Sequence, residues 1–518
     1  MSPDAPELPP ATEDDVAHPT AGTLQRQAVR GSLWSVLVTA LNVPLTIASL
    51  VVVARSLGPG EFGHYAFVSF VLPLVVTLTD LGVGPALSWS ATSGRVQEGP
   101  VLHDSLASVF TWSLLKAPLT MIVAVVLLHG SPLAAGVLGA EVLCFLLAAG
   151  WNTALGAERR FRASSLLGLA ANALTAVASV VAATFTGSAA WTVVGAWTGR
   201  ALYLFVLAVI VTPELRRATT RFRFALDRKQ MSFAASSYVA GLCATWALGR
   251  SEIVFLRGYS RPAEQGRFAV ATTISSRATL LADSLFASLS STFLALAGGG
   301  EARRVDEAFQ RALRLSVTLA IATAVVAIPI GSIAGPAVFG TGYGHLTGAT
   351  LALLVVSMCT TAAEPLALWI YVHRDARAMI APGLVATTVD VGLCVVLIPR
   401  HGLAGAVAAN AATGIVLIGV QAWLGRLPRA GRADRIRITA VLATDLALCA
   451  TTVLVPLPLG LVARALVATA LCVVGVHLVH RLTTPPLDTG DAEALADSLP
   501  GALRGLTRTA LRVLRLAA

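Results

Sequence analysis

The 518-residue chain has few charged residues, and this shortage argues against a soluble protein. Only 13% of the residues are charged, whereas 55% are hydrophobic, and the mean hydropathy is +0.75. A soluble protein of this composition would lack the polar residues needed to cover its surface. Apolar runs of about 20 residues, the length that crosses the hydrocarbon core of a bilayer, recur along the sequence. We therefore predict an all-α polytopic membrane protein and exclude a soluble enzyme.

The sequence also lacks the patterns of metal, redox and catalytic sites. Its six cysteines all lie in apolar segments without a Cys-x-x-Cys pair, and its nine histidines form no cluster. No loop exceeds about 20 residues and no loop contains Asp-x-Asp, which argues against a membrane-bound glycosyltransferase or polymerase. We expect no metal, no cofactor and no catalytic residue, and hence a protein that is not an enzyme.

The apolar runs predict about fourteen transmembrane helices. They are expected at residues 31–54, 62–88, 104–128, 133–155, 165–185, 189–211, 233–256, 268–296, 313–333, 346–372, 380–398, 403–424, 436–455 and 458–480.

The net charge of +10 is explained by membrane topology and not by nucleic-acid binding. Arginines collect in alternate loops, such as residues 213–230 and 426–435, whereas the loops at residues 129–131 and 186–188 carry no Lys or Arg. Because basic loops stay on the cytoplasmic side, we expect a cytoplasmic-membrane protein with both termini in the cytoplasm.

A short motif occurs twice, 203 residues apart. The first copy contains Pro59, Glu61 and Gly63, and the second contains Pro262, Glu264 and Gly266. The same shift places Asp80 on Asp283, each deep in the apolar run that follows its motif. The register of these matches indicates an internal duplication of six spans in parallel orientation. The two halves would surround a central site.

This duplication predicts how the chain is divided. We expect a disordered tail at residues 1–25, an N-terminal half at 26–212 and a basic linker at 213–230. A C-terminal half at 231–425 and an extra helix pair at 436–480 would follow. The remaining residues, 481–518, would form a cytoplasmic tail with an amphipathic helix, because Arg504, Arg508, Arg512 and Arg515 share one helical face.

Eleven candidate ionisable residues lie well inside the expected spans, where a charge is costly unless it faces a cavity or a partner. The basic ones are candidate cavity cations for an anionic substrate: Lys116, Arg200, Arg250 and Arg277. The alternative is that they pair internally with acids such as Glu141, Glu364 or Asp390. The acidic candidates for binding a coupling proton or sodium ion are Glu252, Glu364, Asp390, Asp80 and Asp283, although the last two could serve packing alone.

The N-terminal region resembles a known transporter family. The resemblance is carried by Arg30-Gly31-Ser32-Leu33-Trp34, by residues 54–66 around the first motif, and by Asp80-Leu81-Gly82-Val83-Gly84-Pro85-Ala86-Leu87. It is similar to the polysaccharide-transporter (Wzx-type flippase) branch of the multidrug/oligosaccharidyl-lipid/polysaccharide exporter (MOP) superfamily. Glu252, fourteen residues before Gly266, matches the acidic residue usual in the family's seventh span.

The resemblance implies two six-helix bundles around a cavity that opens alternately to each side of the membrane. The implied cargo is a polyprenyl-diphosphate-linked oligosaccharide for a cell-surface polysaccharide. Glycosyltransferases and a polymerase of the same pathway are further candidate partners, beside the lipid bilayer. A cation-coupled multidrug exporter of the same superfamily and a flippase for lipid-linked peptidoglycan precursors remain alternatives.

Overall fold

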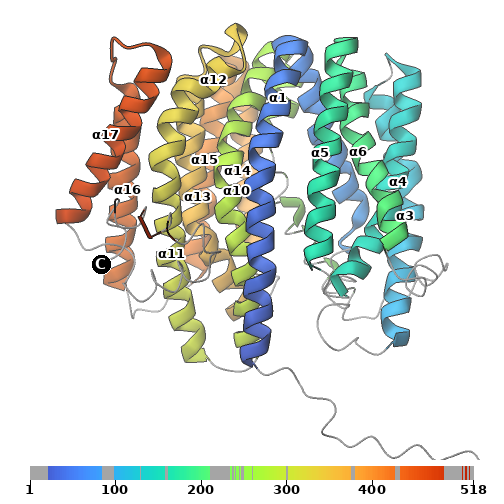
Figure 1. Cartoon of the computed structure of the whole chain (residues 1–518), viewed down its shortest axis with the longest axis horizontal. Coiled ribbons are helices and arrows are strands. Elements are labelled where there is room, and N and C mark those ends of the chain that lie inside the picture. The colour runs from blue at the N-terminus through green and yellow to red at the C-terminus, as the bar shows by residue number, and fades with distance from the viewer. Residues whose placement is uncertain are drawn as a thin grey trace, which may run out of the picture.

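The structure is a computed structural model whose described part consists of helices only (Figure 1). It describes residues 21–83, 99–157 except 129, 161–210, 250–298 except 260, 302–374, 380–425 and 432–482, with isolated residues elsewhere. Within these ranges, nine helices are long and apolar enough to cross a membrane. The chain is thus an all-α polytopic membrane protein, as the sequence predicted. The 213–230 linker lies outside the described residues.

The first two expected spans form one labelled helix, α1 (Ala21–Asp80), which is interrupted at Gly58. Gly58 has φ 70° and ψ 171°, in the left-handed region that glycine tolerates best. Pro59 then begins the second segment, where its missing N–H costs nothing because a first-turn N–H has no partner in a helix. The chain therefore reverses direction at this point. Helix α1 begins inside the segment 1–25 that we expected to be disordered, so the helical chain starts earlier than predicted.

Four helices complete the N-terminal half: α3 (Gly99–Leu127), α4 (Pro132–Ala157), α5 (Phe161–Thr186) and α6 (Ala189–Ile210). Their core contains Leu72, Leu138, Val142 and Val193, all fully buried. The cluster joins α1, α3, α4 and α6 into one bundle, which lies on the right in Figure 1.

A turn lies within one of the expected spans of the C-terminal half. In the span expected at 233–256, Arg250 and Ser251 form a turn, after which the short helix α9 (Glu252–Gly258) begins. Arg250 has φ 79°, which is rare for a residue with a side chain and is typical of functional sites.

The remaining helices of this half follow in order: α10 (Pro262–Gly298), α11 (Ala302–Pro329), the π-helix η2 (Ile330–Ala334), α12 (Gly335–Val338), the 3₁₀ turn η3 (Thr341–Tyr343), α13 (Thr347–Arg374), α14 (Ile380–His401) and α15 (Leu403–Leu424). Proline at position 329 ends the regular hydrogen-bonding pattern of α11, and the π-helix follows directly.

The extra helix pair, α16 (Arg432–Leu454) and α17 (Leu461–Leu482), packs against α11. Its interface contains a buried polar pair, in which His480 Nε2 lies 2.7 Å from Asp445 Oδ2. Both side chains are at most 1% exposed. Of the expected amphipathic tail helix, the structure describes only isolated residues, one of which, Val513, offers its carbonyl oxygen to His477 Nδ1 at 2.8 Å.

Replacing Asp445 with alanine is expected to destabilise the helix pair, because His480 would lose its buried partner. The expected cost is about 1–3 kcal/mol. Thermal unfolding in detergent measures it, with Thr444→Ala as a control because Thr444 is exposed on the same turn. The double change Asp445→Leu with His480→Leu should recover most of the loss, since it replaces both buried polar side chains together. An unchanged melting temperature for Asp445→Ala would contradict this role.

Candidate functional site

Three of the four predicted cavity cations gather around one tyrosine. The hydroxyl of Tyr65, on the second segment of α1, lies within electrostatic range of the guanidinium groups of Arg200, Arg250 and Arg277. Arg200 comes from α6 in the N-terminal half, Arg277 comes from α10 in the C-terminal half, and Arg250 lies at the turn before α9. The cluster therefore combines cations from both halves. We call these three residues the arginine cluster.

Two side chains of the arginine cluster, those of Arg200 and Arg250, contact neutral groups. The Cζ atom of Arg200 lies 4.8 Å from the centre of the Trp197 ring and 5.9 Å from that of Phe145, which are cation–π contacts. Arg250 donates from Nη2 to Ser276 Oγ at 3.0 Å. Within the described residues, no member of the cluster has a carboxylate within ion-pair distance.

The alternative that these arginines pair with buried acids gains no support from the described contacts. Thr198 donates to Glu141 Oε1 at 2.6 Å, and Glu141 Oε2 is buried without a partner. Glu252 interacts with Arg250 only at longer range. The cluster thus keeps its positive charge available for an anion. Sequence reasoning had no means of finding Tyr65 or Ser276, because the helix packing alone brings them to the arginines.

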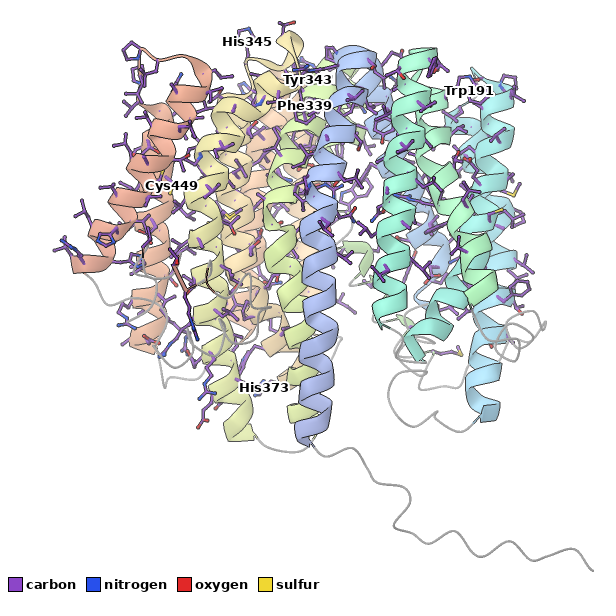
Figure 2. The ribbon with its side chains drawn as sticks, in the orientation of Figure 1. Trp191, Phe339, Tyr343, His345, His373 and Cys449 are labelled. Atoms are coloured by element: carbon purple, nitrogen blue, oxygen red, sulfur yellow. The ribbon has the colours of Figure 1, made fainter. Side chains whose placement is uncertain are left out.

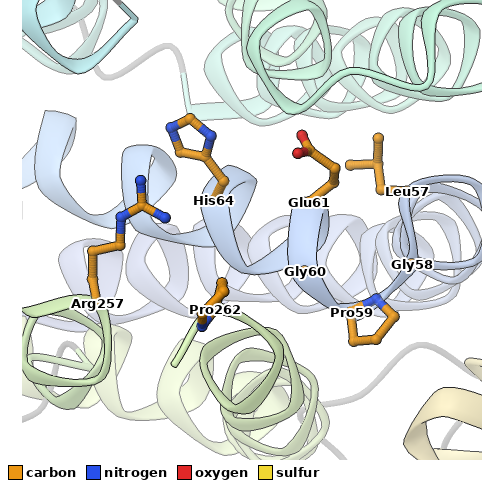
Figure 3. Close-up of a pocket in the computed structure, with 8 residues that line it drawn as sticks. All are labelled: Leu57, Gly58, Pro59, Gly60, Glu61, His64, Arg257 and Pro262. Carbon is orange, nitrogen blue, oxygen red and sulfur yellow. The ribbon is translucent and has the colours of Figure 1, made fainter. Parts of the chain in front are cut away.

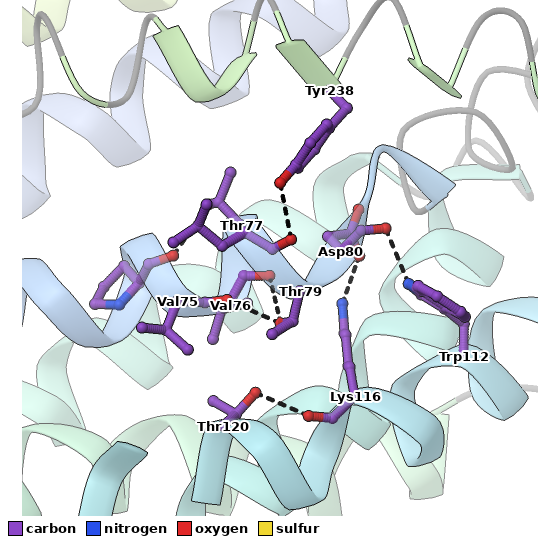
Figure 4. Close-up of polar contacts among 11 residues, drawn as sticks. Val75, Val76, Thr77, Thr79, Asp80, Trp112, Lys116, Thr120 and Tyr238 are labelled. Atoms are coloured by element: carbon purple, nitrogen blue, oxygen red, sulfur yellow. Dashed lines mark hydrogen bonds and ion pairs between the residues drawn. The ribbon is translucent and has the colours of Figure 1, made fainter. Parts of the chain in front are cut away.

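The fourth candidate cation, Lys116, is paired instead. Its Nζ atom forms an ion pair with Asp80 Oδ1, and the Trp112 indole donates to the Asp80 carbonyl oxygen at 2.9 Å (Figure 4). The Asp80 and Lys116 side chains are 17% and 8% exposed. Their mutual neutralisation favours a packing role for both, one of the two readings left open for Asp80.

A buried group of oxygen atoms in the C-terminal half includes two of the predicted coupling acids. Glu252 (α9) and Asp390 (α14) are both fully buried and interact with each other electrostatically. Asn410 Nδ2 donates to Glu252 Oε1 at 2.8 Å, Ser251 Oγ to Asp390 Oδ2 at 2.5 Å, and Thr413 Oγ1 to Asp390 Oδ1 at 3.4 Å. We call Glu252, Asp390, Asn410 and Thr413 the acidic site.

Two negative charges among neutral oxygen atoms suit a small hard cation or a proton. Glu252 Oε2 is buried without a partner, so one oxygen atom remains available for such a ligand. No group of three or more His, Cys, Asp or Glu side chains able to hold a metal was found among the described residues. Asn410 and Thr413 were missed at the sequence level, although their spacing of three on α15 places them on one helical face.

The other two acidic candidates contact each other. Asp283 on α10 and Glu364 on α13 lie close enough to interact electrostatically, and Thr279 Oγ1 donates to Asp283 Oδ2 at 3.1 Å. Asp283 therefore has an acidic partner where its repeat equivalent Asp80 has a lysine. Their role in coupling stays a prediction.

The sequence of the chain matches the model of a known protein family. A family model described as "Polysaccharide biosynthesis protein" matches residues 28–289, about half of the chain. The chain belongs to this family. No curated protein matches it in sequence.

Solved structures show the same fold. One titled "Lipid II flippase MurJ, inward closed conformation" has a TM-score of 0.63 at 13% identity and covers 86% of this chain and 98% of that one. A multidrug resistance MATE family transporter of the MOP superfamily, in its outward-facing conformation, has a TM-score of 0.58 at 15% identity and covers 80% and 96%. Its inward-facing conformation gives 0.55 at 15% identity and covers 80% and 99%. The chain thus belongs to the polysaccharide biosynthesis family and shares its fold with these transporters, in line with the resemblance seen in the sequence.

Proposed function

We propose that the chain is a flippase that moves a polyprenyl-diphosphate-linked oligosaccharide across the cytoplasmic membrane by alternating access. The observation that carries the proposal is the arginine cluster, in which three guanidinium groups from both halves lie without acidic partners among the described residues. In this proposal the substrate serves the assembly of a cell-surface polysaccharide, in line with the family of the chain.

A diphosphate fits the cluster for two reasons. Each guanidinium can bind two phosphate oxygen atoms at once through its planar fork of N–H donors. Several arginines can also match the charge of a diphosphate, whereas a cationic drug would be repelled. The sugars need a polar path across the membrane, while the polyprenyl tail can stay in the bilayer. A lipid-linked peptidoglycan precursor carries the same diphosphate, so the cluster alone does not select the glycan.

The acidic site is proposed to couple transport to an ion gradient. It lies in the C-terminal half only, and Glu252 follows directly on the turn that carries Arg250 and Ser251. Loading a cation at Glu252 and Asp390 would remove their negative charge close to Arg250 in the chain. Binding at the acidic site can therefore change the potential felt by the diphosphate.

Deletion of the gene in its host tests the proposal. The deletion strain should lose surface polysaccharide and accumulate the lipid-linked oligosaccharide in the inner leaflet, where a glycosidase added outside cannot reach it. Complementation with the parental chain should reverse both changes. Intact surface polysaccharide combined with drug sensitivity would favour a multidrug exporter instead. Accumulation of a peptidoglycan precursor would assign the chain to that lipid.

A further inference from the structure

The two copies of the duplicated motif meet each other at one end of the bundle. A Cβ atom on Gly63 would lie 2.2 Å from the carbonyl oxygen of Pro262 in the second copy. A Cβ atom on Gly266 would lie 2.0 Å from the carbonyl oxygen of Pro59 in the first copy. Each contact is the counterpart of the other under the 203-residue shift. Because real Cβ atoms do not approach backbone oxygens so closely, only glycine permits this contact.

The glutamate of each motif copy forms a hydrogen bond to the first residue of a helix in its own half. Glu61 Oε2 accepts a hydrogen bond from the backbone N–H of Ala189, the first residue of α6, at 3.2 Å. Glu264 Oε2 accepts one from Leu403, the first residue of α15, at 2.8 Å. A carboxylate at a helix N-terminus satisfies a free N–H and complements the helix dipole. The glutamates thus make each copy move with its own half.

Further contacts between the halves surround the two glycines. Arg55 donates from Nε to the Val338 carbonyl oxygen at 2.8 Å, and the Tyr343 hydroxyl donates to that of Ala54 at 3.5 Å. Burial raises the pKa of the Tyr343 phenol, so the hydroxyl keeps the proton that it donates. Phe62 packs edge-on against Tyr343 with ring centres 6.3 Å apart. Tyr343 and Phe339 lie at the upper end of the bundle in Figure 2, opposite the end where His373 lies.

The contact between the copies is part of a larger packed interface that includes Phe62 on α1 and Phe268 on α10. A pocket of about 500 Å³ lies beside it, lined by Glu61, His64, Arg257 and Pro262 among others (Figure 3). The arginine cluster lies deeper: Arg200 follows Ala189 by eleven residues on α6, and Arg277 follows Gly266 by eleven on α10. Eleven helical residues span about 16 Å. The motif contact therefore separates the cluster from this end of the protein.

The halves also touch at the opposite end of the second α1 segment. A Cβ atom on Gly82 would lie 2.1 Å from the Ala234 carbonyl oxygen, and Tyr238 donates from its hydroxyl to the Leu78 carbonyl oxygen at 3.1 Å (Figure 4). The structure thus contains contacts between the halves on both sides of the arginine cluster.

From these contacts we propose that the two motif copies form a gate, in which the Gly63–Gly266 contact is the closing surface. The gate rests on the alternating-access part of the proposed function, and the charge pattern of the loops places it on the outer side of the membrane. Opening it requires the two copies to part, while Glu61 and Glu264 keep each copy attached to its own half. Any side chain at position 63 or 266 holds the gate open by blocking the contact.

A distance measurement across the gate tests this proposal without substrate. Spin labels are placed on noncanonical amino acids at Thr186 and His345, two exposed positions in different halves, so that the six native cysteines stay in place. In lipid nanodiscs, the distance distribution between the two labels contains a short population for the closed gate and a long population for the open gate. Gly63→Ala and Gly266→Ala should each raise the ratio of the long to the short population at least tenfold over the parent. Gly60→Ala is the matched control, because a Cβ atom at Gly60 meets nothing within 4 Å; its distances should match the parent.

A second variant covers the case in which an alanine at the contact prevents folding. Arg55→Ala removes the hydrogen bond to Val338 without adding bulk, and it should raise the same ratio by a smaller factor, about threefold. Folded Gly266→Ala or Arg55→Ala proteins with parental distances would overturn the gate. Because no substrate is present, such a result would leave the proposed function standing. A wrong substrate, conversely, would leave the distances as expected.

Discussion

Replacing Arg200 or Arg277 with alanine is expected to weaken binding of a polyprenyl-diphosphate glycan by about ten- to 150-fold. Each arginine supplies charge-assisted hydrogen bonds worth about 1.5–3 kcal/mol, and 1.4 kcal/mol corresponds to a factor of ten. Surface-polysaccharide export should fall accordingly while the protein stays in the membrane at parental levels. Binding is measured with the purified protein in nanodiscs, and export by complementation of a deletion strain.

Three further variants test the same prediction. Arg464→Ala is the control, because Arg464 lies in the extra helix pair and donates to the Val453 carbonyl oxygen at 3.0 Å; it should bind normally. Arg200→Lys and Arg277→Lys keep the charge but lose the fork, so they should recover only part of the affinity. Parental binding and export by both well-expressed alanine variants would rule out the arginine cluster as the diphosphate site. Loss of protein from the membrane would instead indicate a structural role for these arginines.

Replacing Glu252 with glutamine is expected to abolish stimulation of transport by an ion gradient while substrate binding is retained. Glutamine keeps the shape of the side chain but cannot change charge, so the acidic site loses the ability to load and release a cation. Asp390→Asn should have the same effect, since the two carboxylates lie in one site. The measurement is flipping of a labelled lipid-linked sugar in proteoliposomes with imposed proton and sodium gradients.

Glu307→Gln is the control for this experiment, because Glu307 is an exposed glutamate on α11 outside the acidic site. It should respond to the gradient as the parent does. Gradient-stimulated flipping by Glu252→Gln at the parental rate would show that Glu252 is not the coupling residue. A response to only one of the two gradients in the parent would identify the coupling ion.

The sequence predicted the helical spans well because membrane helices are defined mainly by the length of their apolar runs. The expected span at residues 403–424 coincides with α15, and the span at 189–211 differs from α6 by one residue. The duplicated motif was visible because it combines Pro, Glu and Gly at fixed spacing. Its physical reason was not visible: the contact of the two glycines and the capping by the two glutamates depend on how the halves pack.

Other features could not be predicted because they depend on side chains from distant segments. The turn at Arg250 was not recognised from the sequence, although Gly249 directly precedes it and the polar residues Arg250, Ser251 and Glu252 interrupt the apolar run. Lys116 and Arg200 looked alike as buried cations, yet Asp80 neutralises the first and aromatic rings hold the second. Asn410 and Thr413 gained a candidate role only when α15 was seen beside Glu252 and Asp390.

In the proposed function, the arginine cluster is what allows the protein to flip a lipid-linked diphosphate glycan. The most direct measurement reconstitutes the purified chain in proteoliposomes with a fluorescent polyprenyl-diphosphate oligosaccharide and follows its exposure to an external glycosidase. Parental protein should expose the inner-leaflet pool well above the rate in protein-free vesicles, whereas the Arg200→Ala, Arg277→Ala double variant should not exceed that rate. Equal rates for the parent and empty vesicles, or for the parent and the double variant, would contradict the account.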